Sequence, residues 1–226
     1  QHFLDSKSEV QFHKRNMRFS MEQIMAILSI GMAPFFLQLL SSGIAFLINS
    51  TLAEYAGSPL MADRAVGAYG IINSIALVGF MFMLGIAQGM QPIVGYNYGA
   101  RAMRRVRQTF NICAVVNLSI GLFVTVAALS APRFLASMFT SSPEMIEASA
   151  DALRCCIYGF AFVGFQVTAT QFFQSIGFGG KAMLLSLSRQ TLFLIPALFG
   201  FPLLWGSKGV WVALPFSDIC AGVLGI

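Results

Sequence analysis

The chain has 226 residues, of which 57% are hydrophobic and only 10% are charged, and its mean hydropathy is +0.74. A soluble globule of this size needs more polar surface, so the composition excludes that class and favours a membrane-embedded protein. The net charge of +5 is gathered into a few clusters of Lys and Arg, which is typical of loops between membrane spans and disfavours a nucleic-acid-binding face.

Charge-free stretches mark the expected membrane helices, because about 20 mostly apolar residues cross a hydrocarbon core about 30 Å thick. Residues 1–20 are polar, lack the features of a secretory signal, and are predicted to form a tail that precedes the spans. Six stretches follow, at residues 23–53, 65–100, 108–132, 155–180, 190–207 and 209–226. The fifth can begin near Ala182 if Arg189 extends to the headgroups. Residues 21–226 are therefore predicted to form an all-α bundle of six transmembrane helices.

Two helix starts carry capping signals. Residues 20–23, with the sequence SMEQ, are typical of a capping box that opens the first helix. Ser142 followed by Pro143 and Glu144 predicts a capped helix that begins outside the hydrocarbon, ahead of the fourth span.

The positions of Lys and Arg predict the orientation. Ten of them fall on the side of the N-terminus: Lys7, Lys14, Arg15, Arg18, Arg101, Arg104, Arg105, Arg107, Lys181 and Arg189. Only Arg64, Arg133, Arg154 and Lys208 fall on the other side, together with five acidic residues. The positive-inside rule predicts that both ends are cytoplasmic, in an inner membrane, and that the arginines at 101–107 form a cytoplasmic loop.

Motifs for catalysis, cofactors and metals are missing from the sequence. It contains no HExxH or GxSxG pattern, and both histidines, His2 and His13, precede the spans. The stretch SIGFGGKA at 175–182 lacks the first glycine of a phosphate loop and has Ala182 where Ser or Thr would hold magnesium. The four cysteines show no CxxC spacing. We therefore predict a protein that is not an enzyme and has no catalytic residues, metal site or cofactor.

Uncharged polar residues recur at helical spacing within the spans. Gln38, Ser42 and Asn49 share a face of the first helix, Gln166, Thr170 and Gln174 step by four in the fourth, and the second contains Asn73, Gln88 and Gln91. Such residues either line a transport path or bond one helix to another, at about 1 kcal/mol or less each. Both interpretations stay open here. Two GxxxG pairs, Gly85 with Gly89 and Gly95 with Gly99, indicate close helix approach only weakly.

Asp218 is the only carboxylate inside a predicted span, three residues after Pro215. An acidic group at mid-membrane must be protonated, paired or hydrated, and is a functional candidate. Three roles are open: carrying a coupling proton, pairing with a basic residue such as Arg189, or facing water and bonding backbone groups loosened by the proline.

One segment carries a family resemblance. The stretch GIAQGMQPIVGYNYGARAMRRVRQTF at 85–110 resembles the second helix of the C-terminal half of multidrug and toxic compound extrusion (MATE) transporters. The residues that carry this motif are Gln91, Pro92, Gly95, Tyr96, Asn97 and Gly99. Residues 133–146, 172–190 and 209–219 are similar to further stretches of the family, in the same order.

The resemblance implies two lobes of six helices, of which this chain is the second, with residues 1–20 as part of a cytoplasmic linker and an N-terminal lobe as its missing partner. Gln1 in place of Met fits a fragment, and processing that removes a Met is the alternative. It implies export of organic, often cationic drugs in exchange for protons or sodium. A related branch flips lipid-linked saccharide precursors, which is the alternative function. Members that bind sodium in this lobe use carboxylates on its early helices, and the first, second and fourth spans have none. A channel and a purely structural subunit are the alternatives from other classes.

Overall fold

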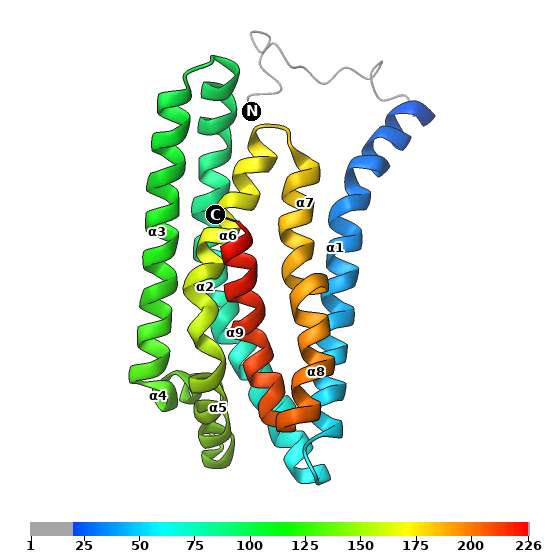
Figure 1. Cartoon of the computed structure of the whole chain (residues 1–226), viewed down its shortest axis with the longest axis vertical. Coiled ribbons are helices and arrows are strands. Elements are labelled where there is room, and N and C mark those ends of the chain that lie inside the picture. The colour runs from blue at the N-terminus through cyan, green and yellow to red at the C-terminus, as the bar shows by residue number, and fades with distance from the viewer. Residues whose placement is uncertain (1–19, 226) are drawn as a thin grey trace, which may run out of the picture. The chain divides into compact units, whose positions relative to one another are not determined.

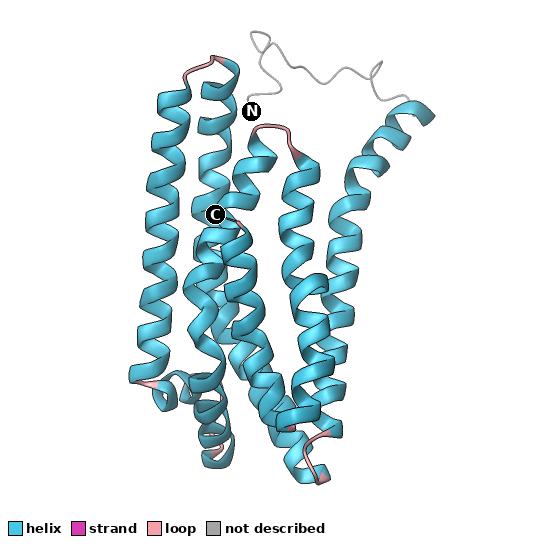
Figure 2. Cartoon of the chain, viewed as in Figure 1, coloured by secondary structure: helices cyan, strands magenta, loops and turns pink. Residues whose placement is uncertain are grey.

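The structure is a computed structural model that describes residues 20–225, except for the side chains of residues 23, 26, 27, 29–34 and 37. Throughout these residues the chain is helical apart from short turns, and no strand occurs among them (Figure 2). The predicted all-α class is confirmed.

Each of the six predicted spans coincides with a helix in the described part of the chain. They are α1 (Met21–Glu54), α2 (Pro59–Gly99), α3 (Met103–Ser130), the pair α5 (Pro143–Cys156) and α6 (Phe160–Ser175), the pair α7 (Gly179–Leu187) and α8 (Ile195–Trp205), and α9 (Ser207–Leu224). The 3-10 turn η3 (Ile157–Gly159) joins α5 to α6, the π-helix η4 (Ser188–Leu194) joins α7 to α8, and the short α4 (Pro132–Ser137) follows α3. Among the described residues, four segments are long and apolar enough to cross a membrane: 59–99, 103–130, 143–175 and 179–205.

Packing divides the chain into two compact units, Gln1–Ser42 and Gly43–Ile226, with α1 contributing to both. In the first unit α1 begins directly after Ser20, whose carbonyl accepts the amide of Ile24 at 3.0 Å. The predicted boundary between a linker at 1–20 and a lobe at 21–226 stays a prediction.

In the second unit, α2 is the central helix. It packs against α3, α5 and α6, and its buried residues recur every three or four positions, from Ala68 through Met83 and Ala87 to Asn97. This spacing follows the 3.6-residue turn, so one stripe of the helix faces the core along its whole length. The turns after α2 and α6 lie at one end of the unit, and α4, the start of α5 and the α8–α9 turn lie at the other (Figure 1).

The contact between α3 and α6 depends on two glycines. A Cβ atom at Gly164 would lie 2.5 Å from the Asn117 carbonyl oxygen, and one at Gly121 would lie 2.7 Å from Ala161 Cα. The backbones of α3 and α6 therefore lie too close together for a residue larger than glycine at these two positions. The predicted GxxxG pairs behave differently. Among the described residues, a Cβ added at Gly85, Gly89 or Gly99 would meet no atom of another helix within 4 Å, and only one at Gly95 would meet a backbone atom, the Ser175 carbonyl oxygen at 3.3 Å.

The helix starts differ in part from prediction. The second helix begins at Pro59, earlier than the charge-free stretch, and the Ser58 hydroxyl accepts the amide of Met61 at 3.3 Å. Ser142 does occupy the N-cap position of α5, but its side chain makes no cap bond, and its amide donates to the Thr140 hydroxyl instead at 3.3 Å.

The prediction of an arginine loop was wrong. The turn between α2 and α3 contains only residues 100–102, and α3 begins at Met103, so Arg104, Arg105 and Arg107 lie in its first turns. Arg101 closes α2 with a φ of 57°, while the amides of Arg101 and Ala102 donate to the carbonyls of Tyr98 and Asn97. This bonding satisfies the last carbonyls of α2 and lets the next helix begin at once.

Candidate functional site

Three glutamines meet where α2 and α6 approach one end of the bundle. The amide of Gln91 donates to the side-chain oxygen of Gln171 and, at 3.4 Å, to that of Gln174. Pro92 follows directly and removes one backbone donor from α2. The cluster is half-buried to exposed, so it offers amide groups at a surface next to a weakened point of the helix.

The remaining motif residues shape the end of α2. Asn97 is buried, and its amide donates to the Ile93 carbonyl at 2.8 Å, whereas the Tyr96 side chain is 78% exposed. Gly99 is the last residue of the helix and Gly95 lies against α6. Within this chain, Asn97 and Gly95 therefore serve packing, and Tyr96 and Gln91 are available to a ligand or partner.

The face of α2 opposite its core stripe is exposed along its length. It contains Asn73, Gln88, the open glycines Gly85 and Gly89, and Pro92. A membrane helix with amides and glycines on its exposed face is suited to line a polar passage or to meet further helices closely.

The three polar residues predicted on one face of the fourth span have different environments. Gln166 is buried and its amide donates to the Leu185 carbonyl at 2.9 Å, which ties α6 to α7. Thr170 is buried one turn later, and Gln174 is exposed in the glutamine cluster. The structure therefore gives Gln166 an interhelical bond, and only Gln174 reaches a surface.

The polar residues predicted in the first helix fall in two units. Gln38 is exposed in the first unit, and its carbonyl accepts the Ser42 hydroxyl at 3.1 Å. Asn49 belongs to the second unit, where its side-chain oxygen is buried without a hydrogen-bond partner. An unpaired buried acceptor is unusual, which keeps Asn49 a candidate site residue.

Asp218 and Arg189 form an ion pair between α9 and the π-helix η4, with 3.0 Å between Arg189 Nη1 and Asp218 Oδ1. The two side chains are 32% and 15% exposed. Of the three roles open to Asp218, the structure contains the pairing with Arg189. The expectation that Arg189 extends to the headgroups was wrong, because α7 begins at Gly179 and so places Arg189 about 15 Å along its span.

Irregular backbone surrounds this pair. Arg189 lies in a π-helix, Pro215 interrupts α9 three residues before Asp218, and the 3-10 turn η3 packs against α9 so closely that a Cβ at Gly159 would lie 2.7 Å from Asp218 Cβ. Single π-helical turns are frequent at functional sites. Tyr69 of α2 is close enough to Arg189 for an electrostatic interaction, and Cys156 is close enough to Asp218 for one.

A buried bridge at the centre of the bundle escaped the sequence interpretation. The amide of Asn117 on α3 donates to the Met83 carbonyl of α2 at 3.2 Å and to the Thr168 hydroxyl of α6 at 2.8 Å. Asn117 has no amide or hydroxyl residue three or four positions away in the sequence, so helical spacing did not single it out, and only the meeting of three helices makes it a bridge. Among the described residues, no group of three His, Cys, Asp or Glu side chains could hold a metal ion.

Comparison with known proteins connects this arrangement to one family. The MatE family model matches residues 34–199. Curated relatives include the multidrug export protein MepA of Staphylococcus aureus (strain MSSA476), 25% identical over 97% of this chain and 47% of its own length. MepA of Staphylococcus haemolyticus (strain JCSC1435) is 23% identical over the same shares.

A crystal structure of MATE in complex with MaL6 superposes with a TM-score of 0.83 at 23% identity. The match covers 99% of this chain and 50% of that one. The chain spans about half the length of the relatives and solved structures that it matches.

Proposed function

Because the chain belongs to the MATE family of membrane transporters, we propose that it forms one lobe of a two-lobe exporter of organic, often cationic drugs. Export is driven by exchange for protons or sodium, and the chain has no catalytic activity of its own. The N-terminal lobe, which precedes this one, supplies the opposite wall of the path.

The exposed polar face of α2 carries this proposal. Asn73 and Gln88 supply amides among exposed apolar side chains such as Phe82, and Gly85 and Gly89 leave open space beside them. Sites in transporters built from repeats lie between the repeats, so a polar face that the chain's own helices leave exposed is where a second lobe and a substrate are expected. Uncharged amides and the exposed Tyr96 suit a range of organic cations better than one fixed charge would.

Efflux measurements test the proposal. Proteoliposomes that contain this lobe with its N-terminal partner are expected to expel a cationic dye when a proton or sodium gradient is imposed, and residues 1–226 alone are expected not to. Robust efflux by residues 1–226 alone would contradict the two-lobe arrangement. Ion flow without exchange would indicate a channel, and no dye movement in either preparation would contradict drug export.

The orientation is a second part of the proposal: both ends are cytoplasmic, in the inner membrane. The basic residues at the start of α3 and Lys181 at the start of α7 lie at one end of the second unit, and the acidic residues of α5 lie at the other (Figure 1). Positive charge is enriched on the cytoplasmic side of membrane proteins.

Cysteine labelling checks the orientation. In a variant without the native cysteines, Ser58→Cys and Ser141→Cys should react with an impermeant maleimide added outside the cell, and Ala100→Cys should react only after the cells are opened. All three positions are exposed, so accessibility reports the side of the membrane. The reverse labelling pattern would overturn the orientation.

A further inference from the structure

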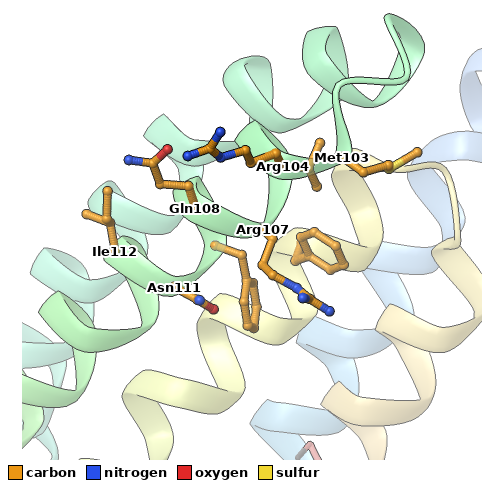
Figure 3. Close-up of a pocket in the computed structure, with 9 residues that line it drawn as sticks. Met103, Arg104, Arg107, Gln108, Asn111 and Ile112 are labelled. Atoms are coloured by element: carbon orange, nitrogen blue, oxygen red, sulfur yellow. The ribbon is translucent and has the colours of Figure 1, made fainter.

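A pocket of about 1080 Å³ lies at the beginning of α3 and extends to Phe172 of α6 (Figure 3). Arg104, Arg107, Gln108 and Asn111 stand on the first three turns of α3 (Figure 3). The pocket lies wholly in the second unit and does not involve the residues considered above for transport.

The floor of the pocket is apolar. Val106 is 5% exposed and belongs to a core cluster with Met90 and Val94, against which Phe110 and Phe172 pack. The rings of Phe110 and Phe172 meet edge to face with their centroids 5.0 Å apart. The floor is therefore a fixed aromatic surface, and its shape does not depend on a ligand.

The rim of the pocket carries uncompensated positive charge. Arg104 and Arg107 are exposed, and the ion pairs found between residues 20 and 225 all use other arginines, namely Arg64, Arg133, Arg154 and Arg189. The first turn of α3 contains no acidic residue. The positive end of the α3 helix dipole adds to the positive potential of the rim.

An apolar stripe continues from the pocket along α3. Ile112, Val115, Leu122 and Phe123 are all more than half exposed, and at 3.6 residues per turn they fall on one side of the helix. They belong to a segment of mean hydropathy 2.4. A ligand that binds here thus meets two arginines first, then two amides, and then an extended greasy surface. This order of chemical groups matches a phospholipid, from its phosphate through its ester groups to its acyl chain.

We propose that this pocket binds an anionic phospholipid of the surrounding membrane leaflet, with the phosphate at Arg104 and Arg107. Gln108 and Asn111 face the glycerol and ester region, and the acyl chain follows Ile112 and the exposed stripe. Basic pockets between membrane helices bind such headgroups. A soluble anion would use the arginines but gain nothing from the stripe, so the structure favours a lipid.

Native mass spectrometry of the full chain in detergent tests the site, with phosphatidylglycerol and phosphatidylcholine as probes. The unaltered protein is expected to retain phosphatidylglycerol in preference to phosphatidylcholine. The variant Arg104→Gln/Arg107→Gln should weaken phosphatidylglycerol binding roughly tenfold or more, because it removes both cationic groups that would donate charge-assisted hydrogen bonds to the phosphate. The matched control Arg101→Gln/Arg105→Gln removes the same charge outside the pocket and should change binding less than about threefold.

Several results would overturn the proposal. Equal weakening by the two double variants would mean general attraction of basic residues to lipid, without a site. Equal retention of the two lipids by the unaltered protein would exclude headgroup recognition, and this comparison needs no variant to fold. Competition by glycerol phosphate at the same concentration as the lipid would indicate a site for a soluble anion.

Discussion

Replacing Asp218 with Asn alone is expected to lower stability more than replacing it together with Arg189→Gln. Asp218→Asn alone leaves the Arg189 guanidinium inside its span without a counter-charge. Arg189→Gln alone would in the same way leave the Asp218 carboxylate without one. Loss of one partner of a buried ion pair costs about 3–5 kcal/mol, and the partial exposure of this pair places it toward the lower end. The double variant leaves two neutral groups that still bond each other.

The measurement is thermal unfolding in detergent, followed by the fluorescence of Trp205 and Trp211, which lie in α8 and α9. The exposed pair Arg154 and Asp151, at 3.7 Å, provides the control. Arg154→Gln or Asp151→Asn should change the free energy of unfolding by less than about 0.5 kcal/mol. If the effects of the two single changes on the free energy of unfolding sum to the effect of the double change, the two side chains are not coupled, and a paired role would be contradicted.

The same Asp218→Asn variant separates pairing from ion coupling. If the variant folds but abolishes proton-driven efflux at all pH values, Asp218 carries or gates the exchange. If its efflux and the pH dependence of efflux match those of the unaltered protein, the ion pair serves structure alone, and Asp218 does not take part in transport.

Gly164→Ala and Gly121→Ala should each destabilise the bundle by about 1–3 kcal/mol. The neighbours that a Cβ would meet at 2.5 and 2.7 Å are backbone atoms, the Asn117 carbonyl oxygen and Ala161 Cα, which cannot turn away as a side chain can. The helices α3 and α6 would have to separate, which would also lengthen the hydrogen bond from Asn117 to Thr168.

Gly85→Ala is the matched control, because Gly85 is also a helical glycine but a Cβ added there would meet no other helix of the described residues within 4 Å. Alanine should there be neutral or stabilise by up to about 1 kcal/mol through helix propensity. Thermal unfolding of residues 1–226 checks both expectations. Equal effects at Gly85 and Gly164 would show that backbone approach is not what Gly164 provides.

Much of the fold follows from the sequence alone. Charge-free stretches located all six helices, since the hydrocarbon thickness sets a minimum length that few other patterns meet. The motif at 91–99 indicated the family that the match to residues 34–199 confirmed. Helix ends were less accurate, because Pro59 and Met103 begin their helices among polar residues that a search for apolar runs passes over.

Contacts between distant residues were decided only by the tertiary structure. Spacing placed Gln166 and Gln174 on one face of a helix, but the packing of α7 buried the first and left the second exposed. The sequence determined that Asp218 needs compensation, because a carboxylate in a membrane span must be neutralised, paired or hydrated. The sequence did not determine that Arg189 provides this charge. The pairing depends on the register between η4 and α9, which is set by how their side chains and irregular backbone pack together.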